Sequence, residues 1–299
     1  LSSNKLLIMD PFVDPEDVDL EMMRYKPNGW PMIPMFIEAV MRNGRVPEDY
    51  DMSHLLAAGA GCEAVNNNQL DRVQEFLHKH NCNVRFTVGY GSSEGGSNLT
   101  FQMAPKSVHN GNVGIPMPLN DMGVFKPGTQ EELGYNEMGE ICTVGPGNML
   151  GYDRRSATAK TLQRHADGKI WLHTGDIGYV DEDGVFYVLN RGAAFRYGGG
   201  ELAVLPMENR LADAKIKGIK DEFFVLIEDE DHDGYFVPYL YVVLEDGYKV
   251  DDIIKDVQSC LEPYMFPVEI LAIDERPFFH FKTNRIELSK ELKKKNHDC

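Results

Sequence analysis

The sequence predicts a mixed α/β protein: a partial doubly wound parallel sheet, followed by a small β-barrel-like unit and a separate α+β C-terminal domain. Apolar strand-like runs alternate with amphipathic helical runs through the first hundred residues, the pattern of a parallel sheet covered by helices. Short β-runs separated by turn residues follow, and the last hundred residues combine hairpin-like runs with an amphipathic helix. We therefore expect a partial α/β subdomain over 1–104, a β-rich subdomain over 105–190 and an α+β domain over 191–299.

The first subdomain is predicted to begin with a strand at 5–12 and two helices. Asp14 can accept hydrogen bonds from a helix N-terminus and Pro15 suits a first helical turn, so these residues start the first helix. The apolar residues that follow recur at helical spacing as far as Tyr25. A second helix is expected over roughly 30–42.

Two further strands of this subdomain run into glycine. The run HLLAAGAG predicts a strand over 54–61, the periodic run after it a helix over 67–80, and VRFTVGYG a strand over 84–91. Ligands of open α/β sheets bind outside the carboxyl ends of the strands. Both glycine-rich ends are therefore candidate binding edges.

The rest of the chain is predicted from turn signals and one clear helical pattern. Between 105 and 190 we expect β-runs, the last of them ending near Arg191. Apolar residues at helical spacing predict a helix over 251–261.

Composition limits the partners and the compartment. The chain of 299 residues carries 30 basic and 47 acidic residues, a net charge of −17, which disfavours binding to nucleic acid or to anionic lipid. No apolar run approaches the roughly 20 residues of a membrane span. The five cysteines are scattered without metal-ligand spacing and are expected to be reduced thiols. These observations predict a soluble, cytoplasmic protein.

An ordered series of motifs carries most of the functional information. YGSSEGG (90–96) is followed by GEICTVGPGNMLGY (139–152), WLHTGDIGYVDEDGVFYVLNR (171–191), GGGELAVLPMEN (198–209) and LEPYMFP (261–267). This order resembles the adenylate-forming (AMP-binding) superfamily, and its acyl-CoA synthetases in particular, because GGGE precedes LPMEN. The resemblance extends from about residue 6 to 292, and the TGD segment is its most specific part.

The resemblance implies carboxylate activation. A small-molecule carboxylic acid attacks the α-phosphorus of ATP, pyrophosphate leaves, and the acyl-adenylate is captured by a thiol of coenzyme A or of a carrier protein. Because negative charge must be managed on phosphate oxygens, positioning and electrostatics supply most of the catalysis in such reactions. ATP or AMP, Mg²⁺ and coenzyme A are therefore the expected ligands.

Family roles transfer to residues that match the motifs. By resemblance, Tyr90 stacks on adenine, Ser93 replaces a threonine that contacts the α-phosphate, and Glu94 holds Mg²⁺. The run 57–61 resembles the segment that flanks adenine. The nucleotide-binding residues implied are Gly59, Ala60, Gly61, Tyr90, Gly91, Ser93, Asp176 and Arg191.

Asp176 is the leading candidate among them. In the TGD motif the family's aspartate accepts hydrogen bonds from the ribose hydroxyls, which requires an ionised carboxylate on a rigid β-element. Arg191 matches an arginine that contacts the nucleotide and marks the start of the mobile C-terminal domain.

Several positions depart from the family pattern. No Ser/Thr/Gly-rich loop ending in lysine occurs, although the family uses one to wrap the β- and γ-phosphates. The hinge role, usually held by aspartate or lysine, falls on Ala194. Arg285 stands in place of the lysine that approaches the α-phosphate, with Lys282 three residues earlier, and the planar fork of arginine is not equivalent to an ammonium.

We therefore expect the C-terminal part of an AMP-forming carboxylic acid ligase, truncated before the phosphate loop and inactive alone. The missing strands would leave an exposed sheet edge through which copies can associate. The alternative is a catalytically degenerate homologue that binds AMP or a partner.

Overall fold

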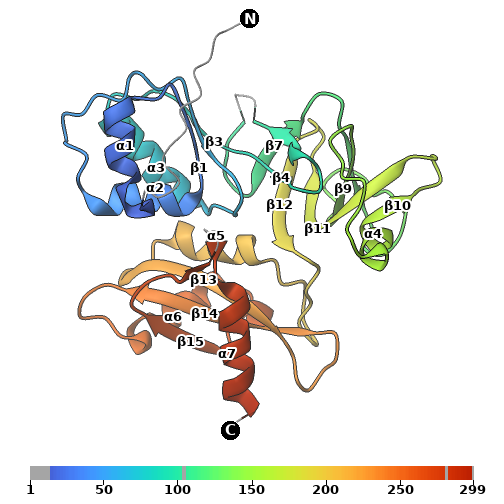
Figure 1. Cartoon of the computed structure of the whole chain (residues 1–299). Coiled ribbons are helices and arrows are strands. Elements are labelled where there is room, and N and C mark those ends of the chain that lie inside the picture. Colours follow the sequence, from blue (N-terminus) through green and yellow to red (C-terminus); the bar gives the residue numbers. More distant parts are fainter. Residues whose placement is uncertain (1–13, 103–105, 280–281, 298–299) are drawn as a thin grey trace, which may run out of the picture.

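The computed structural model describes residues 14–102, 106–279 and 282–297. It confirms the mixed α/β class, with an N-terminal α/β unit, a curled β-sheet and a C-terminal α+β unit below both (Figure 1). The strand predicted at 5–12 lies outside the described residues. The boundaries proposed at 104/105 and 190/191 stay predictions.

A three-stranded parallel sheet forms the centre of the N-terminal unit. Its strands lie in the order β1 (Gly29–Met32), β2 (Ala57–Ala60) and β3 (Phe86–Val88). The parallel arrangement predicted for the first hundred residues is confirmed, although both predicted strands are shorter than expected. The prediction that a helix starts near residue 30 is wrong, because 29–32 pairs with β2 as a strand.

The helices of this unit start where local chemistry favours a start. A 3-10 turn (Pro15–Asp17) leads into α1 (Val18–Tyr25), and the Asp14 carboxylate accepts the Glu16 N–H at 3.0 Å, as predicted. α2 (Pro34–Asn43) starts at a proline, which needs no hydrogen-bond acceptor in a first turn. α3 (Asn67–Lys79) starts with a reciprocal capping box between Asn66 and Gln69.

The β-rich region forms one curled, antiparallel sheet, which confirms the barrel-like expectation. Strand order is β6-β7-β12-β11-β9-β8, with β10 also paired to β11. The strands are β6 (Thr100–Phe101), β7 (Asn112–Pro116), β8 (Asp121–Phe125), β9 (Gly139–Val144), β10 (Leu162–Arg164), β11 (Ile170–Val180) and β12 (Phe186–Arg191). A short hairpin of β4 (Gly91–Ser92) and β5 (Ser97–Asn98) precedes it, and α4 (Arg155–Thr161) was not predicted.

The C-terminal unit packs helices on a three-stranded sheet. The sheet order is β13-β14-β15. The elements are α5 (Val204–Ala214), β13 (Ile219–Glu228), β14 (Phe236–Leu244), α6 (Val250–Cys260), a 3-10 turn (Pro263–Met265), β15 (Glu269–Ile273), β16 (Phe278–Phe279), β17 (Lys282–Thr283) and α7 (Arg285–His297). α6 confirms the helix predicted over 251–261, with Ile253 and Val257 fully buried.

Helix α5 faces the N-terminal units (Figure 1) and contacts the start of α3. The Asn67 N–H donates to Asn209 Oδ1 at 2.9 Å, and the Asn67 side-chain amide donates to Asp213 at 3.1 Å. Asn67 and Asn209 are both buried. These contacts join the C-terminal unit to the parallel-sheet unit.

Two structural findings concern the expectations about membrane spans and cysteines. No helix within the described ranges is long and apolar enough to cross a membrane. The four described cysteines, Cys62, Cys82, Cys142 and Cys260, are free. Cys299 lies outside the described residues.

Candidate nucleotide site

The centre of the candidate site is the carboxylate of Asp176. β11 and β12 pair in a register that places Asp176 opposite Arg191, and the Arg191 guanidinium donates to Asp176 Oδ1 at 2.7 Å. Tyr90 follows β3, and its hydroxyl donates to Asp176 Oδ2 at 2.7 Å. The structure thus brings together three predicted residues that are far apart in the sequence.

In this cluster both carboxylate oxygens of Asp176 act as hydrogen-bond acceptors. Burial, and then the charge of Asp176, raises the pKa of the Tyr90 hydroxyl well above its usual value, so Tyr90 stays protonated and donates. A carboxylate offers about four lone-pair positions, so one hydrogen bond to each oxygen leaves acceptor capacity for ligand hydroxyls. The Tyr90 ring belongs to the buried core and is 9% exposed.

Ser93 and Glu94 lie in the turn between β4 and β5. Ser93 is exposed, and Glu94 Oε1 accepts a hydrogen bond of 2.7 Å from the Tyr152 hydroxyl. That hydrogen bond is the main cause of the lowered pKa of Glu94. An ionised, partly exposed carboxylate is a suitable oxygen ligand for Mg²⁺ together with substrate phosphates. Tyr152 was missed as a site residue because its contact spans 58 positions.

The predicted glycines are explained in part by backbone packing. A Cβ on Gly59 would lie 2.6 Å from Thr87 Oγ1 on the neighbouring strand, and one on Gly91 would lie 1.9 Å from the Ser97 carbonyl oxygen. Gly61 has more room, because a Cβ there would lie 3.5 Å from the Gly89 carbonyl oxygen. Ala60 is buried in β2.

Arg285, the first residue of α7, is bound by protein groups. Its Nη1 lies 3.2 Å from Glu63 Oε1 and its Nη2 lies 3.0 Å from Glu208 Oε1, while Nε donates to the Phe224 carbonyl. Glu63 follows β2, so this contact brings α7 to the carboxyl end of the parallel sheet. No sequence motif identified Glu63 as a partner of Arg285.

The two remaining predicted residues, Lys282 and Ala194, belong to the C-terminal unit. Lys282 is exposed in the β16–β17 hairpin. Ala194 is 4% exposed in the core of the C-terminal unit, and its carbonyl accepts the Leu202 N–H at 2.7 Å. The hinge assignment to Ala194 stays a prediction.

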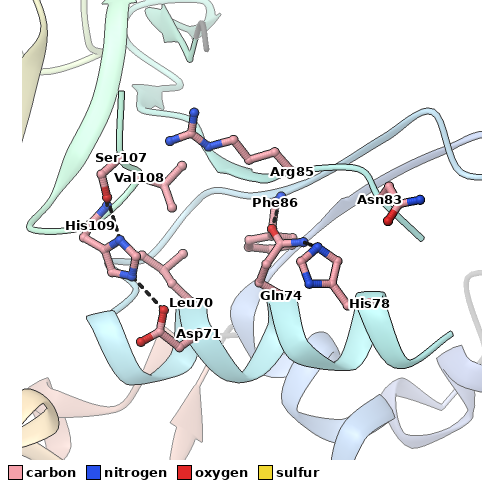
Figure 2. Close-up of a pocket in the computed structure, with 10 residues that line it drawn as sticks. All are labelled: Leu70, Asp71, Gln74, His78, Asn83, Arg85, Phe86, Ser107, Val108 and His109. Carbon is pink, nitrogen blue, oxygen red and sulfur yellow. Dashed lines mark hydrogen bonds and ion pairs between the residues drawn. The ribbon is translucent and has the colours of Figure 1, made fainter. Parts of the chain in front are cut away.

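A cavity of about 330 Å³ opens between α3 and the segment that follows β6 (Figure 2). Ser107 Oγ lies 2.6 Å from His109 Nδ1, and His109 Nε2 lies 2.8 Å from Asp71 Oδ1. These are the residue types of a nucleophile relay, but the Asp71 side chain is 60% exposed, so water competes for its carboxylate. None of the described residues that line this cavity belongs to the predicted nucleotide site.

Comparison with known proteins supports the motif assignment. The sequence model described as "AMP-binding enzyme" matches residues 1–153. The chain is 30% identical over 261 residues to 4-coumarate–CoA ligase 2 of Nicotiana tabacum, a match that covers 85% of this chain and 46% of the relative.

Solved structures share the fold. ATP-bound MatB from Rhodopseudomonas palustris superposes with a TM-score of 0.78 at 21% identity, over 96% of this chain and 55% of that one. The anthranilate CoA ligase AuaEII, in complex with anthranoyl-AMP, gives a TM-score of 0.75 at 18% identity, over 93% of this chain and 52% of that one.

The chain spans about half the length of each of these proteins. The family match covers half of the chain, and the fold and motif order agree with it. The chain therefore belongs to the AMP-binding enzyme family.

Proposed function

We propose that this chain carries the nucleotide-binding part of an AMP-forming carboxylic acid ligase that transfers an acyl group to a thiol, that of coenzyme A in the first instance. The observation that carries the proposal is the buried Asp176 carboxylate held between Tyr90 and Arg191. The names of the relatives, CoA ligases for 4-coumarate and anthranilate, support a small-molecule carboxylic acid as substrate.

Each residue then has a defined task. Asp176 accepts hydrogen bonds from the ribose hydroxyls, the segment 59–61 flanks adenine with Tyr90 and Gly91, and Ser93 donates to the α-phosphate. Glu94 would hold Mg²⁺, which neutralises phosphate charge when bound. Arg191 contributes positive charge beside the nucleotide in a chain whose net charge is −17.

The reaction proceeds in two displacements. A carboxylate oxygen attacks the α-phosphorus and pyrophosphate leaves. The thiol sulfur then attacks the acyl carbon and AMP leaves. Contact of Arg285 or Lys282 with the α-phosphate would require Arg285 to leave Glu63 and Glu208, a change of position that fits a mobile C-terminal domain with Ala194 at its hinge.

We also propose that this chain by itself has little adenylation activity, because it contains no Ser/Thr/Gly-rich loop ending in lysine. A second candidate function is AMP or partner binding without catalysis. The engagement of Arg285 by two carboxylates favours that second function, since it occupies the cation that should meet the phosphate. A cytoplasmic location and self-association through a sheet edge stay predictions.

Two measurements test the proposal. Calorimetry with AMP should detect binding that Asp176→Ala weakens by about tenfold or more, because hydrogen bonds to a charged group are lost. Asp183→Ala, in the exposed turn between β11 and β12, is the matched control. Acid-dependent release of pyrophosphate from ATP, measured over a panel of carboxylic acids, separates ligase from binding protein. AMP affinity unaffected by Asp176→Ala would remove the proposed site.

A further inference from the structure

Two buried histidines and a partly buried glutamate form a hydrogen-bonded row that reaches the turn carrying Asp176. His165 Nε2 lies 2.9 Å from His173 Nε2, and His173 Nδ1 lies 2.9 Å from Glu140 Oε2. His165 precedes β11, His173 lies within β11, and Glu140 lies on β9. Both histidines are 7% exposed, and the Glu140 side chain is 14% exposed.

The row ends on the backbone of the TGD segment. The Gly175 N–H donates to Glu140 Oε1 at 3.0 Å. The pairing of β9 with β11 is interrupted between His173 and Ile177, so the Glu140 carboxylate supplies an acceptor where the strand ladder breaks. Gly175 has φ +75°, a conformation that favours glycine.

The neighbouring residues of the turn are held in the same place. Thr174 Oγ1 donates to the Ile141 carbonyl at 2.6 Å and accepts the Asp176 N–H at 3.1 Å. The turn is thus attached to β9 at Thr174 and at Gly175. A change at Glu140 would reach the Asp176 carboxylate through a single intervening residue.

The direction of the hydrogen bonds follows from charge. Hydrogen bonding to His173 lowers the pKa of Glu140 against the opposing effect of burial, so the carboxylate is ionised and only accepts. We therefore assign a proton to His173 Nδ1. His173 Nε2 is then an acceptor, and His165 Nε2–H is the donor that fixes the His173 ring.

The same atoms do not form a ready metal site. Glu140, Cys142 and His173 offer ligand atoms within 4.8 Å of one another. Both oxygens of Glu140 already accept hydrogen bonds, and burial strongly raises the pKa of the Cys142 thiol, which keeps it protonated. A positioning role uses every donor and acceptor as it stands.

We propose that Glu140 and His173, with His165 behind them, are positioning residues that hold the Thr174–Asp176 turn in the form that binds the nucleotide. The proposal rests on the proposed function of Asp176 and extends it to regulation by acid. Two imidazoles that face each other through Nε2 can share one proton, but two protons place N–H against N–H and break the row.

The charged and aromatic groups around the two histidines determine the pH at which this break occurs. Burial, and then the neighbouring His173, lowers the pKa of His165, while Asp167 opposes this shift. Cys142 and Glu140 face the pair from β9, Arg191 acts on Glu140 from β12, and the Phe125 and Trp171 rings pack on His165. His165 therefore takes up a proton only below the usual imidazole pKa of about 6.5, and the row breaks when both rings carry a proton on Nε2.

Calorimetry of AMP binding to the full chain tests the proposal. His173→Phe keeps a ring without a donor, and Glu140→Ala removes the acceptor; each should weaken binding about tenfold. His173→Asn places an amide donor near the position of Nδ1 and should stay within about threefold of the parent. His78→Asn, an exposed histidine on α3, is the control. Affinity of the parent should fall from pH 6.5 to 5, and His165→Gln should flatten this fall.

A second measurement tests the positioning role without any bound nucleotide. Hydrogen exchange of the 174–176 amides should be at least about tenfold faster in Glu140→Ala than in the parent, because the Gly175 N–H loses its acceptor. Unchanged exchange overturns the proposal even if AMP does not bind to the parent, an outcome that refutes only the proposed function. Stoichiometric Zn²⁺ binding that His173→Phe abolishes would assign the row to a metal and also overturn the proposal.

Discussion

Arg285 and Glu208 form an ion pair of 3.0 Å between Nη2 and Oε1, and the same carboxylate oxygen accepts the Phe224 N–H at 3.0 Å. Glu208 is 4% exposed, so losing either partner would leave its buried carboxylate short of a hydrogen bond. Arg285, which we predict to take the place of a phosphate-contacting lysine, thus also stabilises the C-terminal unit. Its loss should therefore affect stability and activity separately.

Arg285→Ala should lower the free energy of unfolding by about 2 kcal/mol, because it leaves the buried Glu208 with one partner fewer. Denaturant titration measures this loss. Lys290→Ala, which removes an exposed pair with Glu287 on the same helix, should have almost no effect. Equal losses in the two variants would show that the Arg285 pair contributes no more to the free energy of unfolding than an exposed ion pair.

Glu222 should make the folded protein less stable as the pH rises toward 8. Burial, and then the charges of Asp221 and Glu208, raises the pKa of Glu222 to about 8, and its Oε1 is buried without a partner in the described structure. Between about pH 4.5 and 8 the folded state holds a proton that the unfolded state has lost, so stability falls as pH rises through this window.

Glu222→Gln should remove this dependence and raise stability at pH 8 by at most about 5 kcal/mol, the equivalent of the whole shift. Thermal unfolding from pH 5 to 8.5 checks it. Glu228→Gln, at the exposed end of the same strand, is the control. A variant whose pH profile parallels that of the parent would contradict the assignment.

Gly91→Ala should destabilise the fold by about 2 kcal/mol, since the added Cβ would lie 1.9 Å from the Ser97 carbonyl oxygen. Gly89→Ala is a matched control in the same segment, because no atom lies within 4 Å of its Cβ and its φ is not positive. Melting temperatures of the two variants decide the point. If both melt alike, the close approach of β4 and β5 does not require glycine.

Asn67→Ala should loosen the contact of α3 with α5. The variant removes donors to Asp213 and Asn110 from a buried position, at a cost of about 1–3 kcal/mol. Limited proteolysis between β12 and α5 should become faster. Asn43→Ala removes an exposed contact to the Glu16 carbonyl within the N-terminal unit and should leave that rate unchanged. Protection of the segment in both variants would show that Asn67 does not hold the two units together.

Elements with a strong local pattern could be predicted from sequence. Helical periodicity identified α3 to within a residue, because an apolar face is encoded over a few positions, and the structure adds the capping box between Asn66 and Gln69. The strand at Gly29–Met32 was mistaken for helix because four residues carry too little periodicity to distinguish the two. Its conformation depends on pairing with β2, far along the chain.

The residues of the candidate site also differ in whether the sequence could predict them. Asp176, Tyr90 and Glu94 could be identified because they lie in short motifs whose order is specific. Tyr152 and Glu63 could not, because each matters only through a contact that folding creates.

By itself, the sequence determined the family and the order of motifs, and it predicted the positions at which we propose that a nucleotide binds. Only the tertiary structure decided that Asp176 lies between Tyr90 and Arg191, that Arg285 is paired with Glu63 and Glu208, and that a histidine row supports the TGD turn. Motifs record the residue types that local chemistry requires. Partners across strands and units depend on register and packing, which many sequences can satisfy and which no local spacing encodes.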